Sequence, residues 1–252
     1  MKVELEAVRK RFGRFEALRG ITELIPSGAR IAVTGPNGSG KSTLLRAILG
    51  MVACEGEIRL DGRSPFRHRA AVAADLAYVP QTPPRLGAPV RDLIRATADV
   101  RGIDPGRILE IARRLELDPE SIARRPFQDL SGGMKQKLLI ALALAAPVRL
   151  LILDEPTASL DVETRARFFA LAAEIPATTT LILCSHRAQE VASLAHEVLA
   201  LSDGVVAWRG RASDHLGGTP EPTDRTRRDP LASAGEAANR ALTPLAAALS
   251  PE

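Results

Sequence analysis

A short apolar run, a glycine-rich loop and an amphipathic run follow one another near the start of the chain. Residues 31–34 (Ile-Ala-Val-Thr) are typical of a buried strand, and residues 42–49 place apolar side chains on one helical face. Residues 35–41 between them contain three glycines, which adopt backbone conformations that other residues avoid. The loop must join the end of a buried strand to the start of a helix, which restricts the chain to an α/β core.

This loop matches the phosphate-loop pattern Gly-x-x-x-x-Gly-Lys-Ser in the strand-to-helix context that the pattern requires. Its glycines let backbone N–H groups surround a β-phosphate, and the helix N-terminus adds a positive dipole end. We expect Lys41 to reach the β- and γ-phosphates and the Ser42 hydroxyl to ligate Mg²⁺. An ordinary glycine-rich turn would not need Lys-Ser-Thr in register. The predicted nucleotide contacts of the loop are Gly35, Pro36, Asn37, Gly38, Ser39, Gly40, Lys41, Ser42 and Thr43.

Two acidic residues follow a second apolar strand. Residues 150–153 (Leu-Leu-Ile-Leu) bring Asp154 and Glu155 to the carboxyl edge of the sheet, beside the predicted phosphates. Asp154 is suited to hold Mg²⁺ through a water, and Glu155 to orient and polarise the attacking water as general base. Adjacent acids after an apolar strand also commonly cap the next helix, and Pro156 suits that alternative.

A third motif opens a helix. Ser131, Gly132 and Gly133 precede an apolar helical run over residues 134–146. The serine hydroxyl and the glycine N–H groups would form a second anion-binding helix terminus. One γ-phosphate does not need two helix ends from one subunit. The redundancy indicates that this helix contacts a nucleotide held by another subunit.

Composition and charge narrow the class of protein. The chain has 252 residues, 45% of them hydrophobic and 25% charged, as in ordinary globular proteins. The net charge of +4 is spread along the chain and only 3% of residues are aromatic, so nucleic-acid binding is not expected. Cys54 and Cys184 are isolated, which indicates a reducing compartment. No apolar run approaches the ~20 residues that span a bilayer, and the acidic first residues are not expected to act as a signal peptide.

Strand and helix patterns alternate along most of the chain. Residues 3–8 and 56–62 alternate apolar and polar side chains, as half-buried strands do. Further strands are predicted at 76–79, 150–153 and 180–184, helices at 162–174 and 187–195, and an antiparallel strand pair at 198–201 and 205–208.

Two segments depart from this alternation. Residues 85–128 have helical spacing around loops at 102–106 and 118–119, which indicates an all-helical insertion. From about residue 212 the sequence loses periodicity and gains Pro, Gly, Thr and Arg. Residues 212–252 are therefore expected to form a poorly ordered tail.

Together and in this order, the three motifs resemble the nucleotide-binding domain of an ATP-binding-cassette (ABC) transporter over residues 1–211. The resemblance implies an α/β fold: a P-loop NTPase core with a mostly parallel sheet, an N-terminal antiparallel β subdomain and an α-helical subdomain at about 85–130. It implies ATP and Mg²⁺ as ligands, ATP hydrolysis, a homodimer or paired ABC subunit, and a separate integral membrane permease. The chain would then be cytoplasmic and peripheral on the inner face of the cell membrane, held there by the permease.

The resemblance also assigns roles to residues outside the three motifs. Phe12 lies where these domains stack an aromatic ring on adenine; Phe15 is the alternative, and either could belong to the core. Gln81 resembles the glutamine that senses Mg²⁺ and couples to the membrane subunit. Asp161 ends a loop that crosses the dimer interface, and His186 resembles the histidine that contacts the γ-phosphate. The predicted catalytic residues are thus Glu155, His186, Gln81 and Lys41, and the predicted metal ligands are Ser42, Gln81 and Asp154.

The string Ser-Gly-Gly-Met-Lys-Gln-Lys over residues 131–137 resembles domains of the ABC-2 exporter type, although residues 155–161 also suit importers. Export is therefore the favoured direction. The alternative from another class is a soluble ABC ATPase acting on nucleic acid or the ribosome. Only 50 positions separate Gln81 from Ser131, without heptads, and the chain carries one cassette, both of which disfavour that alternative. A degenerate cassette that binds ATP structurally is disfavoured because every expected active-site residue is present.

Overall fold

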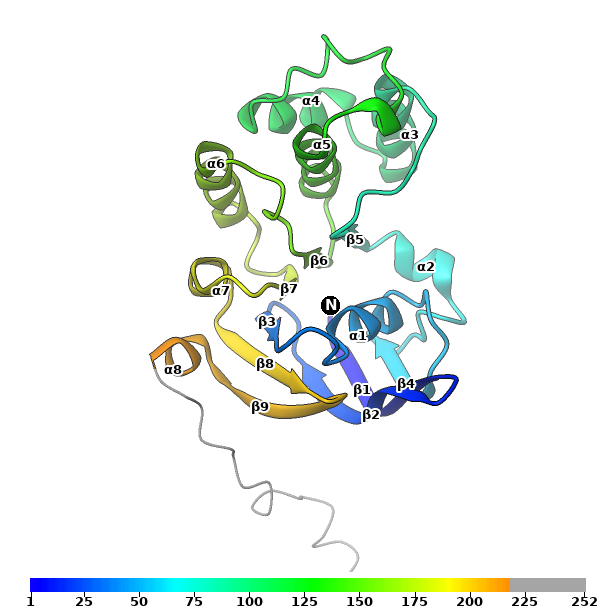
Figure 1. Ribbon diagram of the computed structural model, residues 1–252. Helices are drawn as coiled ribbons and strands as arrows, with labels where there is room; N and C mark the ends of the chain where they lie inside the picture. Colours follow the sequence, from blue (N-terminus) through cyan, green and yellow to red (C-terminus); the bar gives the residue numbers. More distant parts are fainter. Residues whose placement is uncertain (218–252) are drawn as a thin grey trace, which may run out of the picture. The chain divides into compact units, whose positions relative to one another are not determined.

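The computed structural model describes residues 1–217, and the strands of this part form two sheets (Figure 1). The smaller sheet is antiparallel, with the order β2-β1-β4, and the larger has the order β5-β6-β7-β3-β8-β9. Neighbours in the larger sheet are parallel except for β8 and β9. The strands are β1 (Val3–Phe12), β2 (Phe15–Ile25), β3 (Arg30–Thr34), β4 (Glu55–Leu60), β5 (Leu76–Val79), β6 (Leu150–Asp154), β7 (Thr180–Cys184), β8 (Glu197–Ser202) and β9 (Val205–Arg211). The predicted α/β class, mostly parallel sheet and N-terminal antiparallel subdomain are confirmed.

The central parallel strands are buried on both faces. Leu150, Ile152, Ile182 and Cys184 belong to a core that includes apolar side chains of helix α1 (Lys41–Ile48) and of the antiparallel sheet. Their neighbours Leu151, Leu153, Leu181 and Leu183 belong to a second core, together with helices α5 (Gly132–Ala145) and α6 (Val162–Ala173). Strands covered on both sides have no polar face, which explains their continuous apolar sequences.

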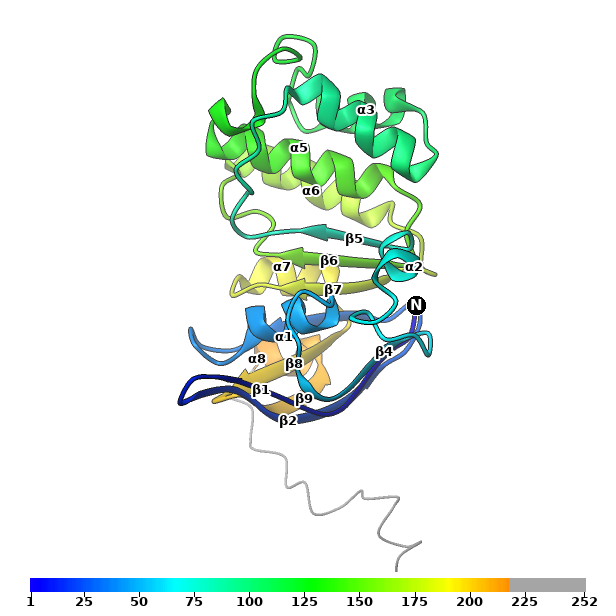
Figure 2. The ribbon, with the colours of Figure 1, turned by 90° about the vertical axis from the view of Figure 1, so that its right-hand side faces the viewer.

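The predicted helical insertion is confirmed, and a backbone hydrogen bond joins its two ends. It contains α3 (Val90–Arg101), α4 (Pro105–Arg114) and a single 3-10 turn over Phe127–Asp129, and it leads into α5. The Phe127 N–H donates to the Ala88 carbonyl oxygen at 2.9 Å, which holds the two ends of the segment together. Figure 2 shows α3 and α5 beyond β5, on the side away from β1 and β2.

Helix starts in this segment follow ordinary capping chemistry. The Asp104 carboxylate accepts a hydrogen bond from the Gly106 N–H at 3.0 Å, and Pro105 occupies the first turn of α4. Gly102 ends α3 in a left-handed conformation, where a residue without a side chain is least strained. These local signals fix where α3 stops and α4 begins.

One strand and two α-helices in residues 1–217 were not predicted. Strand β2 escaped because register shifts against β1 break the regular alternation of its buried residues. The others are the short helices α2 (Arg69–Ala73) and α8 (Ala212–Gly217). Helix α7 (Ala188–Leu194), in contrast, was predicted and lies within the expected range 187–195.

Helix α8 shows that the tail prediction is wrong at its start. Ala212 is buried with Val191 and Val198, and the rings of Trp208 and His215 stack with centroids 5.2 Å apart. Six residues are too few to show helical periodicity, so the sequence carried no signal for this helix. The remainder of the predicted tail, residues 218–252, lies outside the described residues. Across residues 1–217, no helix combines the length and apolarity that crossing a membrane requires.

Candidate active site

The glycine-rich loop leaves the middle of the larger sheet, where β3 pairs with β7 on one side and β8 on the other. Gly35 has a φ of +135°, and a Cβ atom there would lie 2.1 Å from the carbonyl oxygen of Leu201. Only glycine fits this position without displacing β8. The Lys41 ammonium donates to the carbonyl oxygens of Gly35 and Pro36 at 2.8 and 2.9 Å, which folds the loop back over the start of α1.

A hollow of about 200 Å³ lies in front of this loop. It brings together side chains from the loop, from the segment after β5 and from the carboxyl ends of β6 and β7, because parallel strands end at one edge. Its lining residues are Phe15, Ala17, Asn37, Gly38, Gly40, Lys41, Ser42, Thr43, Gln81, Asp154, Glu155 and Cys184. Eight residues predicted from the loop and from the end of β6 thus face one space with Gln81, whereas Gly35, Pro36 and Ser39 are not among its lining residues.

The aromatic lining the hollow is Phe15, the alternative to the predicted Phe12. These residues form the last cross-strand pair of β1 and β2, so only a tight turn separates them and the sequence could not choose between them. Both side chains are exposed, so neither belongs to the core. The ring of Phe12 is not part of the lining and instead lies under the Lys10 ammonium, 5.0 Å from its centroid.

Asp154 ends β6 as a buried carboxylate with an unused oxygen. The Tyr78 hydroxyl donates to its Oδ2 at 3.4 Å, whereas its Oδ1 has no hydrogen-bond partner within the described residues. Burial is the main reason that the pKa of Asp154 is raised, and the adjacent charge of Glu155 adds to it while a hydrogen bond with Cys184 opposes it. A buried carboxylate oxygen without a donor is a suitable cation ligand, and the Ser42 hydroxyl and Gln81 line the same hollow.

Glu155 is held in an unusual backbone conformation. Its φ is +48°, in the left-handed region that costs a non-glycine residue about 1–2 kcal/mol. Its N–H donates to the Cys184 carbonyl oxygen at 2.8 Å, and its side chain is buried with 7% of the residue exposed. Its Oε1 lies 2.7 Å from Nδ1 of His186, and its Oε2 has no partner in the described part of the chain. Backbone strain of this kind is common where a functional group must be held in one orientation.

His186 contacts Glu155 and does not line the hollow itself. Its side chain is 69% exposed. The structure therefore joins two of the predicted catalytic residues to each other, with only Glu155 facing the predicted phosphates.

The third motif lies apart from this hollow. Ser131 is the N-cap of α5, where its Oγ accepts from the Met134 N–H at 3.3 Å, and Gly132 and Gly133 form the first turn. Asp161 is the N-cap of α6; the pKa of its carboxylate is lowered, first by the backbone hydrogen bond from Thr164 and then by that residue's hydroxyl. None of these four residues lines the hollow, and all but the half-buried Gly133 are exposed.

Several buried polar residues near the site were not singled out from the sequence. Gln136 in α5 donates from Nε2 to the Pro156 carbonyl oxygen at 3.0 Å, and the Thr157 hydroxyl donates to Glu190 in α7. A single polar residue on a short helix looks the same in sequence whether it faces solvent or the interior. Only the spacing of its apolar neighbours could have indicated its burial.

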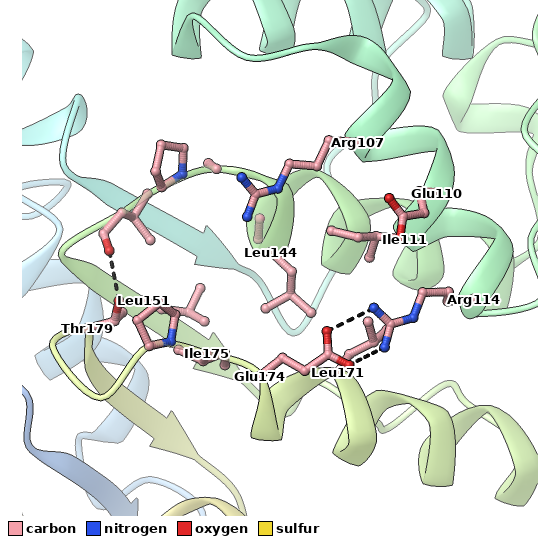
Figure 3. A pocket seen from close by; sticks show the side chains of 15 residues that line it. Arg107, Glu110, Ile111, Arg114, Leu144, Leu151, Leu171, Glu174, Ile175 and Thr179 are labelled. Carbon is pink, nitrogen blue, oxygen red and sulfur yellow. Dashed lines mark hydrogen bonds and ion pairs between the residues drawn. The ribbon is translucent and has the colours of Figure 1, made fainter.

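A second hollow, of about 310 Å³, lies at the opposite ends of β6 and β7 (Figure 3). Its floor is apolar, with Leu144 and Leu171 among its side chains, and its charged rim includes the ion pair of Arg114 with Glu174. The Thr179 hydroxyl donates to the Val148 carbonyl oxygen at 3.0 Å. This hollow has no acid like Asp154 with an unpartnered buried oxygen among the described residues, so we place the chemistry at the first hollow.

Comparison with known proteins agrees with this fold. The family model described as "ABC transporter" matches residues 18–158. The chain is 36% identical over 220 residues to the Fe(3+) ions import ATP-binding protein FbpC 1 of Rhodococcus jostii (strain RHA1), covering 82% of this chain and 62% of that one. It is 33% identical over 222 residues to the sulfate/thiosulfate import ATP-binding protein CysA of Nephroselmis olivacea, covering 81% and 61%. A solved dimeric bacterial ABC transporter cassette matches at 25% identity with a TM-score of 0.73, over 86% of this chain and 100% of that one.

The fold and the site thus define a phosphate-loop ATP-binding domain. The chain belongs to the ABC transporter family, whose ATP-binding subunits are ATPases coupled to transport. It spans about 62% of the length of the first of these curated relatives. Both named relatives are import proteins, so the comparisons do not support the preference for export that residues 131–137 suggested.

Proposed function

We propose that this chain is the ATP-binding and ATP-hydrolysing subunit of an ABC transporter and that it acts through a separate membrane permease. The observation that carries the proposal is the convergence of the phosphate loop, Gln81, Asp154 and Glu155 on one hollow. Membership of the ABC transporter family supports the interpretation of this hollow as an ATP site.

The residues of the hollow fit a nucleotide bound with Mg²⁺. The N–H groups at the start of α1 and the Lys41 ammonium would bind phosphate oxygens, with Phe15 against the base. Ser42, Gln81 and the unpartnered Oδ1 of Asp154 would hold Mg²⁺, which supplies charge neutralisation on the phosphates. No group of three or more His, Cys, Asp or Glu side chains in residues 1–217 could bind a metal ion alone, so such a site depends on the hydroxyl and amide.

Glu155 is the group placed to start hydrolysis. Its free Oε2 would accept a proton from water as the water oxygen attacks the γ-phosphorus. The bond from that phosphorus to the bridging oxygen then breaks, and ADP leaves with the electron pair. His186 holds the other carboxylate oxygen and so orients Glu155 towards the hollow.

We also propose that two cassettes pair, as a homodimer or with a related ABC subunit. Ser131, Gly132, Gly133 and Asp161 lie outside this chain's own hollow, so nucleotide contacts from them would be made to the partner's ATP. The similarity to a dimeric cassette supports this arrangement. Closing the pair would exclude water from both sites, so ATP hydrolysis would depend on assembly.

For direction, the match to import proteins extends over 220 residues and outweighs the seven-residue string that favoured export. We therefore propose import, with the chain on the cytoplasmic face of the membrane and bound there through its permease. The two named relatives differ in cargo, iron(III) ions and sulfate or thiosulfate, at nearly equal identity. We accordingly place cargo selection in the permease and its partners.

The test uses the Glu155→Gln variant, which keeps the side-chain shape and removes the base. Purified full-length variant should bind a fluorescent ATP analogue like the wild type, while phosphate release falls by about 10²–10⁴-fold. Glu163→Gln, a change to an exposed acid in the first turn of α6, is the matched control and should hydrolyse ATP normally. Hydrolysis by Glu155→Gln at the wild-type rate would exclude this residue as the base.

The same variant tests the partner. A tagged Glu155→Gln chain, solubilised from native membranes with ATP present, should co-purify with a polytopic membrane protein. That protein's own relatives would then identify the cargo and direction. Recovery of only soluble proteins or nucleic acid would replace the transporter with a soluble ABC ATPase.

A further inference from the structure

The interior behind the active site contains a carboxylate that the proposed reaction does not use. Glu190, in helix α7, is only 1% exposed. Its Oε1 accepts a hydrogen bond from the fully buried Thr157 hydroxyl and lies 3.8 Å from Nε of Arg187. Its Oε2 has no hydrogen-bond partner among the described residues. A carboxylate buried with so little compensation is costly to the fold, so the question is what it holds.

The partner of Glu190 belongs to the active-site loop. Thr157 follows Glu155 by two residues, and α7 begins two residues after His186. The same two segments are therefore joined twice: by Glu155 with His186 at the hollow, and by Thr157 with Glu190 in the interior. The outer contact is open to water on its histidine side, whereas the inner one is dry.

A third contact fixes the same loop from another helix. Gln136, which is buried in α5, donates to the carbonyl oxygen of Pro156, the residue between Glu155 and Thr157. The loop is thus held by α5 on one side and by α7 on the other. Helix α5 is the one that Ser131 caps, so a hydrogen bond joins the helix of the exposed motif to the loop that carries Glu155.

The left-handed conformation of Glu155 makes these contacts necessary. A strained residue keeps its conformation only when its surroundings hold it there, because relaxation of the loop would release the strain. A hydrogen bond to a charged acceptor in a dry interior is stronger than one between neutral groups in water. The bond from Thr157 to Glu190 is of this kind and acts two residues from the strain.

We propose that Glu190 is a positioning residue for ATP hydrolysis. Through Thr157 it holds Glu155 in its strained conformation, with one oxygen on His186 and the other facing the hollow. Glu190 itself does not line the hollow. This inference rests on the proposed function, since it concerns the base of the same site.

The test compares three variants of the purified full-length chain, with kcat expressed per ATP-binding site and nucleotide affinity measured alongside. Glu190→Ala should lower kcat about tenfold or more, while KM for ATP stays within about twofold. Glu190→Gln keeps an oxygen that accepts from Thr157 and should restore kcat to within about threefold of the wild type. Thr157→Val keeps the side-chain shape, removes the donor and should lower kcat about as much as Glu190→Ala.

A double-mutant cycle separates positioning from mere stability. If the two residues act through one bond, Glu190→Ala combined with Thr157→Val should be no slower than either single variant. Gln189→Ala, at the exposed neighbouring position of α7, is the matched control and should leave kcat unchanged. Should Glu190→Ala fail to fold, Glu190→Gln and Thr157→Val carry the comparison alone.

Two results would overturn the inference. One is that the losses of kcat in the two single variants add in the double variant. The other is that total activity falls only in proportion to the number of ATP-binding sites, so that kcat per site is unchanged. Both concern variants of an active enzyme. Absence of ATP hydrolysis in the wild type would instead refute the proposed function, so the two failures are distinguishable.

Discussion

The two ends of strands β6 and β7 differ in whether their buried polar groups have hydrogen-bond partners. At the amino end, the Thr180 hydroxyl accepts from the Met1 amine and the Gly28 N–H at 3.1 and 2.9 Å and donates to the Met1 carbonyl oxygen at 2.7 Å. That hydroxyl has used its whole hydrogen-bonding capacity. At the carboxyl end, Asp154 and Glu155 are equally buried, yet each keeps an oxygen without a partner in residues 1–217.

The same strands connect the two ends, so we attribute this difference in hydrogen bonding to different roles of the two ends. Polar groups that satisfy one another stabilise the fold and have nothing to offer a ligand. Buried groups left unsatisfied lower stability, and a cation or a reacting water can recover that energy. We therefore propose that the amino end serves stability and that the carboxyl end serves chemistry.

The largest expected effect comes from Gly35→Ala at the carboxyl end. A methyl group 2.1 Å from the Leu201 carbonyl oxygen must displace β8 or the loop, at a φ of +135° that already disfavours alanine. We expect a loss of about 3 kcal/mol or more in the free energy of unfolding. ATP affinity should fall with it, measured by titration of the protein that remains folded.

Gly62→Ala is the matched control for that change. Gly62 also has a positive φ, of +79°, but no atom lies within 4 Å of the position that its Cβ would take. It should cost about 1–2 kcal/mol in denaturant unfolding and leave ATP binding intact. Equal losses in the two variants would mean that the contact with β8 is unimportant.

An intermediate effect, confined to stability, is expected from Thr180→Val at the amino end. The variant keeps the side-chain shape but leaves the Gly28 N–H without its acceptor and removes one of the two acceptors of the Met1 amine. Urea denaturation should show a loss of about 2 kcal/mol, with kcat per folded site unchanged. Thr178→Val, at an exposed position two residues earlier, should change stability by less than about 0.5 kcal/mol. A lower kcat in Thr180→Val would break the proposed division between the two ends.

The smallest expected change in the free energy of unfolding is an increase. Asp154→Asn should abolish hydrolysis but raise the free energy of unfolding at neutral pH by about 0.5–2 kcal/mol, because it removes a buried charge. The pKa of Asp154 is raised by burial, so its protonated form is favoured in the folded state. The stability that this carboxyl contributes is fully present below the ordinary Asp pKa and is lost as pH rises through the folded-state value.

The gain from Asp154→Asn should therefore be present at neutral pH and shrink as pH falls through the raised folded-state pKa, disappearing below the ordinary Asp pKa. Thermal unfolding of the variant and the wild type across this range measures the difference. A gain that is independent of pH would trace it to some cause other than the buried charge.

Much of this architecture follows from local sequence. Strands β5 and β7 were predicted at their observed bounds, because uninterrupted apolar runs between turn residues permit little else. The loop before α1 was located by Gly35 and Gly40, which adopt the left-handed conformations expected of them.

What escaped prediction depends on contacts between distant residues. Phe15 and Phe12 differ only in which strand of a hairpin carries them, and sequence does not show which of the two faces the hollow. Glu190 accepts a hydrogen bond from Thr157, which lies 33 positions earlier in the sequence, and no pattern in α7 predicts that contact. The exposed position of Ser131 is likewise meaningful only once the hollow has been located.

The strand order has a consequence for how the protein is made. Strand β3, which carries the phosphate loop, obtains both of its neighbours from β7 and β8, about 150 residues later in the chain. Helices α4 and α5 pack against each other within a much shorter stretch, so the contacts between them can form while the ribosome is still extending the chain. The proposed nucleotide site is therefore among the last parts to form, because β3 gains its second neighbour only after β8 has been synthesised.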